Sequence, residues 1–365
     1  ARLRAVATRT LALEAIEKIF RELDLGPVTP DTAALEDDES AAIGFHSQGT
    51  VSPDTARVLQ QLVPVFDRLA AMDGTDPGLT SESARAYQRI GDIELRLGNL
   101  DRSRDSYQES LSRYASLGAD NETGDWVRAW ARTNNQLALS YLLEERRGDA
   151  EAGFTRTIAW CDSHVDEPTS ADPWLIYEEA RAHHLLGITL RTDPLEMMRR
   201  MGEGRRGPGR SVRGLVDAFR DAMEGGNRQG ERGVEPPRPE PDADRSGPRS
   251  TSDRAARSPG ERGSVPNSQE PFPGIPESIV RDFTASQASF KRAIELLEPL
   301  VAANPQVAEF RFTLALCYRD GSPPWRLRSN AGQENDLQKQ AVDILERLVA
   351  ESPNVPDYRL ELAET

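Results

Sequence analysis

The chain has 365 residues, of which 37% are hydrophobic and 6% aromatic, a lean composition for one compact core of that length. Its formal net charge of -15 argues against binding to nucleic acid, because an acidic surface repels phosphate. The 2 cysteines argue against a disulfide-rich secreted fold, and no apolar run approaches the ~20 residues that a membrane-spanning helix needs.

Residues 1–75 are expected to form an N-terminal helical hairpin with a polar loop. Apolar side chains recur at helical spacing in residues 3–23 and again in residues 54–72, and the polar, glycine- and proline-containing stretch between them is typical of a loop. The apolar positions are Leu11, Leu13, Ile16, Ile19, Phe20 and Leu23 in the first segment and Val58, Leu62, Val65, Phe66 and Leu69 in the second. We expect the two helices to cap the helices that follow.

Residues 84–117, ARAYQRIGDIELRLGNLDRSRDSYQESLSRYASL, predict two helices joined by a short turn. Gly91 allows the second helix to approach closely, and Gly98 releases the chain into the turn. Ser103 keeps the helix crossing tight, and the Tyr107 ring fills the space beside Gly91. This pattern resembles the tetratricopeptide (TPR) repeat, a helix–turn–helix unit of about 34 residues that binds other proteins.

A second unit of the same kind aligns at residues 131–164. Its matching residues are Leu137, Ala138 and Tyr141 in the first helix and Ala150 and Phe154 in the second. From Ala138 to Phe154 is 16 residues, the same interval as from Gly91 to Tyr107. The recurrence of one interval with similar residue types favours a repeated architecture.

A third first helix is predicted at residues 174–191, with Gly187 in the place of Gly91. The ring expected beside it arrives only at Phe290, 103 residues later instead of 16. We interpret this as one repeat split at its turn by an insertion, residues 192–277, which is rich in Arg, Gly and Pro and too poor in apolar side chains to fold alone. Within it, residues 211–224 are amphipathic and could form either a helix that docks on a partner or a transient helix in a spacer.

A fourth unit has Leu314, Ala315 and Tyr318 in its first helix and Ala341 and Leu345 in its second, and residues 356–365 begin a further helix. The sequence therefore predicts an all-α protein, a TPR-type α-solenoid of about four repeats. The repeats occupy residues 76–191 and 278–365, on either side of the disordered insertion.

The resemblance also implies a concave groove lined by a few first-helix positions. These positions hold Arg85, Gln88, Asp92, Arg96, Arg132, Asn135, Leu139, Arg181, His184, Ile188 and Arg191. Arg85, Arg132 and Arg181 share one repeat position and would form a ladder suited to acidic or C-terminal peptide segments. Gln88 and Asp92 depart from the related carboxylate-clamp pattern, and the alternative is that these are ordinary surface arginines paired with acidic neighbours.

No metal or cofactor is expected. His183 and His184 are adjacent on a helix and point about 100° apart, so they cannot both face one ion. The sequence also lacks a phosphate-binding glycine loop, a nucleophile elbow and an HExxH motif, which leaves a stand-alone enzyme without support.

The arrangement resembles the region C-terminal to the catalytic domain of bacterial serine/threonine protein kinases that carry TPR repeats. The residues behind this resemblance are LALEAIEKIF (11–20), ARAYQRIGDIELRLGNLDRSRDSYQESL (84–111) and PDYRLELAET (356–365). It implies a protein-binding scaffold in a larger signalling protein, either cytoplasmic or tethered to a membrane by a preceding segment. Kinase HRD and DFG motifs are absent, so any phosphotransfer would lie upstream. The alternative is the TPR tail of a sigma-factor-like transcriptional regulator.

Overall fold

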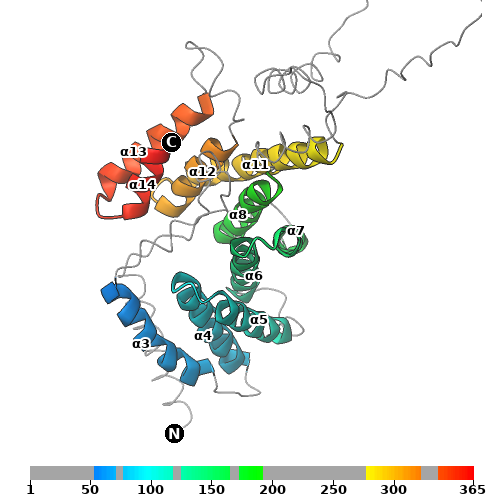
Figure 1. Ribbon diagram of the computed structural model, residues 1–365, viewed down its shortest axis with the longest axis vertical. Helices are drawn as coiled ribbons and strands as arrows, with labels where there is room; N and C mark the ends of the chain where they lie inside the picture. Colours follow the sequence, from blue (N-terminus) through cyan, green and yellow to red (C-terminus); the bar gives the residue numbers. More distant parts are fainter. Residues whose placement is uncertain (1–52, 71–76, 118–124, 165–171, 192–276, 322–335) are drawn as a thin grey trace, which may run out of the picture. The chain divides into compact units, whose positions relative to one another are not determined.

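The computed structural model describes residues 53–70, 77–117, 125–164, 172–191, 277–321 and 336–365. All regular secondary structure in these ranges is α-helical, which confirms the all-α prediction for this part of the chain (Figure 1). The helices are α3 (Pro53–Ala70), α4 (Pro77–Arg96), α5 (Leu100–Leu117), α6 (Asp125–Leu143), α7 (Arg147–His164), α8 (Pro173–Leu190), α11 (Glu277–Ala303), α12 (Ala308–Asp320), α13 (Asp336–Glu351) and α14 (Pro356–Glu364).

The helices expected within residues 3–23 and 211–224, and the insertion 192–276, lie outside the described residues. Within the described ranges, none of the helices combines the length and apolar character needed to cross a membrane.

The turns after α4 and α6 have the same geometry. Gly98 has a positive φ of 77°, and the backbone N–H groups of Gly98 and Asn99 donate to the carbonyls of Leu95 and Glu94, the pattern of a Schellman cap. After α6, Glu145 has a φ of 60° and the same two bonds recur from residues 145 and 146 to residues 142 and 141. Gly98 and Glu145 lie seven residues after Gly91 and Ala138, so the turn follows the same interval in both helix pairs.

Replacing Glu145 with glycine should stabilise the protein. An L-residue in the left-handed region is strained, Glu145 is exposed, and glycine removes the strain at some cost in unfolded-state entropy. We expect the free energy of unfolding in urea to rise by about 0.5–1 kcal/mol. The matched variant is Gly98→Ala, where an added Cβ meets nothing within 4 Å. Its free energy of unfolding should be about 1 kcal/mol lower than that of the wild type, from backbone strain alone. A lower stability of Glu145→Gly would contradict this account of the turn.

Two helix pairs are closed by the same contact between a glycine and an aromatic ring. A Cβ at Gly91 would lie 2.5 Å from Tyr107, and one at Gly187 would lie 2.8 Å from Phe290, so only glycine fits at either site. A serine one turn before each ring, Ser103 or Ser286, donates its hydroxyl to the carbonyl of that glycine, at 3.0 and 2.7 Å. The predicted contact across 103 residues is therefore confirmed.

Helices α6 and α7 also pack closely, but here the glycine lies on the second helix and an alanine on the first. Gly153 of α7 packs against Ala138 of α6, where a Cβ on the glycine would come within 2.6 Å of the alanine methyl. Phe154 and Ala150 are fully buried in the same apolar cluster, as their spacing predicts. Further along the chain, α11, α12, α13 and α14 share another apolar cluster that includes Ala315, Leu345 and Tyr358.

Candidate functional site

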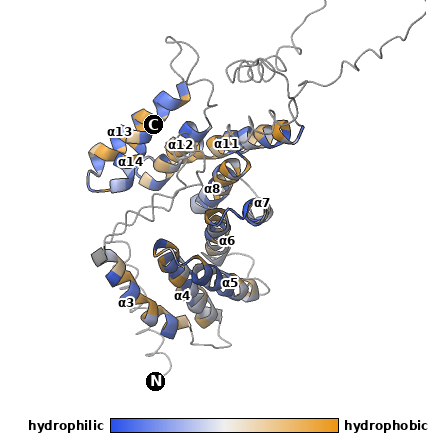
Figure 2. Ribbon diagram, in the orientation of Figure 1, coloured by the Kyte–Doolittle hydropathy of each residue, from blue (hydrophilic) through white to orange (hydrophobic). Residues whose placement is uncertain are grey.

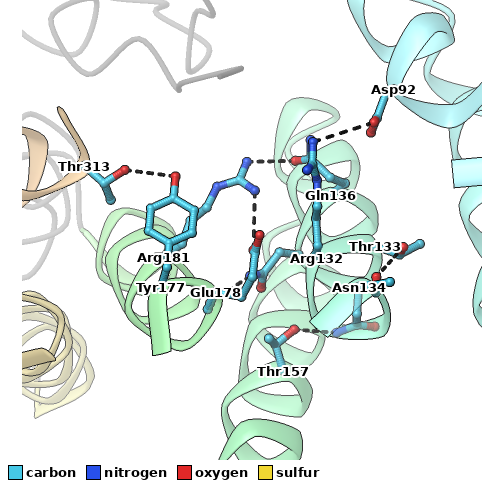
Figure 3. A network of polar contacts seen from close by, with 12 residues as sticks. Asp92, Arg132, Thr133, Asn134, Gln136, Thr157, Tyr177, Glu178, Arg181 and Thr313 are labelled. Carbon is cyan, nitrogen blue, oxygen red and sulfur yellow. Dashed lines mark hydrogen bonds and ion pairs between the residues drawn. The ribbon is translucent and has the colours of Figure 1, made fainter. Parts of the chain in front are cut away.

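The first polar cluster centres on the carboxylate of Asp92, on α4. Tyr107 of α5 donates its hydroxyl to Asp92 at 2.9 Å, and Arg89 donates at 3.2 Å. Burial, with Asp92 adding to it, raises the pKa of Tyr107 well above its usual value, so the hydroxyl keeps its proton. Arg132 of α6 approaches the same carboxylate only to 4.0 Å and is 44% exposed (Figure 3).

The second polar cluster joins α6 to α8. The guanidinium of Arg181 donates to Gln136 Oε1 at 2.8 Å and lies 3.7 Å from Glu178 Oε2, and Figure 3 shows it between these two side chains. Asn135 donates from Nδ2 to the backbone oxygen of Glu178 at 2.9 Å and to its Oε2 at 3.0 Å. All four side chains are buried, so this cluster holds the two helices in register.

A third cluster connects α8, α12 and α14. His184 Nε2 lies 2.8 Å from Asp320 Oδ2, and Arg319 donates from Nε to Asp320 Oδ1 at 3.0 Å and also pairs with Glu361. Burial alone would raise the pKa of Asp320, but Arg319 and the hydrogen bond from His184 hold it well below the usual value. Tyr177 and Thr313 form a further bond between α8 and α12 at 3.2 Å (Figure 3).

The structure places the predicted groove residues in four different environments. Arg181, His184, Gln88, Asp92 and Asn135 are buried polar residues, while Leu139 and Ile188 belong to an apolar cluster between helices. Arg85, Arg96 and Arg191 are partly buried, and Arg191 accepts a hydrogen bond from Arg147 at its backbone oxygen. Arg132 is exposed.

The three ladder arginines are therefore not equivalent. The guanidinium of Arg181 donates to Gln136 and pairs with Glu178. Arg85 is partly buried and makes interactions of its own. Among the described residues, Arg132 has one ion pair, with Asp92 at 4.0 Å, which leaves most of its donors available to a ligand.

Three carboxylates interact electrostatically with Arg132. Although loss of hydration alone would lower its pKa, Asp92 and Glu178 raise the pKa of Arg132 above the ordinary value, so the guanidinium stays charged. Glu309 of α12 also interacts electrostatically with Arg132. Such a group can bind an oxygen acceptor but cannot perform acid–base chemistry.

Sequence reasoning missed Gln136, Glu178 and Glu309. One signal was available, because Glu178 and Arg181 are three residues apart on a helix and can pair. Nothing in the sequence indicated that Gln136 or Glu309 would face these residues, since both contacts come from helices packed together in space.

No metal-binding arrangement is found among the described residues. No group of three potential ligands from His, Cys, Asp and Glu lies close enough there to hold a metal ion. Cys161 and Cys317 are free and buried, and burial raises the pKa of Cys317 well above its usual value, so its thiol is unreactive. Burial, with the nearby charge of Arg292, lowers the pKa of His183 to about 4.

Comparison with known proteins gives no assignment. No family model and no curated protein matches the chain. The crystal structure of BtubC (BKLC) from P. vanneervenii aligns with 82% of this chain and 91% of that chain, at 12% sequence identity and a TM-score of 0.29. A likeness of this extent carries no argument about function.

Proposed function

We propose that this chain is a protein-interaction module, a TPR-type α-solenoid that binds peptide segments of other proteins along its first helices. The observation that carries this proposal is the recurrence of one helix-pair closure, Gly91 with Tyr107 and Gly187 with Phe290, each with its serine bond. Repeated helix pairs present successive side chains at equivalent positions, which suits them to bind an extended chain.

Arg132 is the proposed anchor for that peptide. Its exposed guanidinium donates to oxygen, while Asp92, Glu178 and Glu309 contribute negative charge nearby. These carboxylates would repel a run of acidic residues, so they favour a ligand with a single carboxylate, such as the C-terminus of a protein.

The larger protein that we propose for this module is a bacterial signalling protein with a serine/threonine kinase domain. Its support is the sequence resemblance at residues 11–20, 84–111 and 356–365. The alternative is a sigma-factor-like regulator. The regulator would be favoured if the gene encodes a DNA-binding domain, and not a kinase domain, upstream of this chain.

Replacing Arg132 with alanine should weaken peptide binding. A charge-assisted hydrogen bond is worth about 1.5–3 kcal/mol, so the dissociation constant should rise about tenfold or more. The ligands would be peptides selected from a library displayed with free C-termini, then synthesised with free and with amidated C-termini. Calorimetry should show that amidation weakens binding to the wild type and has little further effect on Arg132→Ala.

The matched control is Arg281→Ala, which removes a 77% exposed arginine from α11 that pairs with its surface neighbour Asp282. Its affinity for the same peptides should equal that of the wild type, and circular dichroism should show unchanged helicity for both variants. Equal binding by Arg132→Ala and Arg281→Ala would show that the peptide binds elsewhere than at this cluster.

A further inference from the structure

Helix α3 has two apolar faces. One face carries Leu59, Val63, Phe66 and Ala70, which are buried in a cluster that includes Ile93 of α4 and other α4 side chains. Helical spacing alone groups Phe66 with Val58 and Val65 in this segment, whereas the structure buries Phe66 and leaves both valines exposed.

Val58 and Val65 lie on the second face. Each is 39% exposed, and they are the two exposed large hydrophobic side chains in the described part of the chain. They are seven residues apart and therefore share a side of the helix, with the partly buried Leu62 and Leu69 beside them. We call Val58, Leu62, Val65 and Leu69 the outer stripe of α3; in Figure 2 the ribbon of this helix carries both orange and blue segments.

We propose that residues 11–23 of the same chain dock as a helix on the outer stripe. Their apolar residues Leu13, Ile16, Phe20 and Leu23 repeat at intervals of three and four, which gives one apolar side that must be buried for the helix to be stable. Consecutive elements of a chain usually pack beside each other, and α3 is the next element described.

The size of the stripe favours this occupant over a second copy of the protein. A stable dimer buries about 800 Å² on each partner, far more than two half-exposed valines provide. A segment tethered in the same chain has an effective concentration in the millimolar range, so a small apolar surface is enough to hold it. The inference concerns α3 alone and does not depend on peptide binding at Arg132.

Disulfide cross-linking in the full chain tests the proposal. Val65→Cys is combined with either Ile16→Cys or Phe20→Cys on the apolar side of the segment, and the matched control combines Val65→Cys with Lys18→Cys on its opposite side. Cys161 and Cys317 are buried, so the unmodified protein serves as the blank. Under mild oxidation, at least one apolar-side pair should form an intramolecular disulfide about tenfold faster than the control.

Two outcomes would overturn the proposal. Equal rates for the Ile16, Phe20 and Lys18 pairs would mean that the segment does not dock on the stripe. Disulfide-linked dimers of Val65→Cys alone would mean that a second copy covers it. A second measurement is independent of the introduced thiols: Ile16→Asp combined with Phe20→Asp should accelerate amide hydrogen exchange in α3 and leave α6 unchanged, and unchanged exchange in α3 would also refute docking.

Discussion

Replacing Gly187 with leucine should destabilise the protein by about 2–3 kcal/mol, because overpacking a closed helix contact forces its neighbours apart. A Cβ at this position would lie 2.8–2.9 Å from three carbons of the Phe290 ring, closer than side chains approach each other. Urea unfolding followed by circular dichroism would measure the loss. The matched control is Gly148→Leu in α7, where an added Cβ meets nothing within 4 Å, and its effect should be small.

The contact between Gly187 and Phe290 can also be tested by removing the Phe290 ring. Phe290→Ala should cost about 3–5 kcal/mol, because it leaves a cavity where a fully buried ring stood. If the ring and the glycine meet as described, the variant with both Gly187→Leu and Phe290→Ala should be more stable than the sum of the two losses predicts. Additive losses would show that these residues, 103 positions apart in the sequence, do not touch in solution.

Replacing Arg319 with leucine should cost about 3–5 kcal/mol at neutral pH, since it leaves buried charges without their partner. The guanidinium pairs with Asp320 and Glu361, which are 2% and 1% exposed. The matched control is Arg281→Leu, because Arg281 is 77% exposed and pairs with a neighbour on the surface, and its effect should be small. If both changes lower the free energy of unfolding by the same small amount, Arg319 does not stabilise a buried charge cluster.

The loss caused by Arg319→Leu should depend on pH. The pKa of Asp320 is lower in the folded protein than in the unfolded chain, so its contribution to stability is present above the unfolded pKa and is lost as the pH falls. Arg319 is the main cause of that lowering. The difference in unfolding free energy between wild type and variant should therefore be largest near neutral pH and shrink as the solution approaches about pH 3. A difference that stays constant with pH would assign the loss to packing instead.

Much of the local fold can be predicted from the sequence. Helical periodicity and the interval from Gly91 to Tyr107 predict the α4–α5 pair, and the same reasoning pairs Gly187 with Phe290 across the insertion. These predictions succeed because the steric demand is local to two residue types: a ring needs space, and only glycine provides it.

The charged site is less predictable. The sequence pattern assigns Arg132 and Arg181 to one repeat position, yet in the structure Arg132 is exposed while Arg181 is buried between Gln136 and Glu178. A repeat pattern indicates which side of a helix a residue occupies, but not which side chains of neighbouring helices will reach it. The same limit explains why Leu139 and Ile188, expected in a groove, pack in an apolar cluster.

The sequence by itself determined that this protein is helical in the described ranges, where its helices pair and which glycine meets which ring, because these features follow from periodicity and side-chain volume. The tertiary structure decided which arginine remains available to a partner and which face of α3 remains uncovered. Burial is set by the helices that pack around a residue, and those neighbours come from distant parts of the chain.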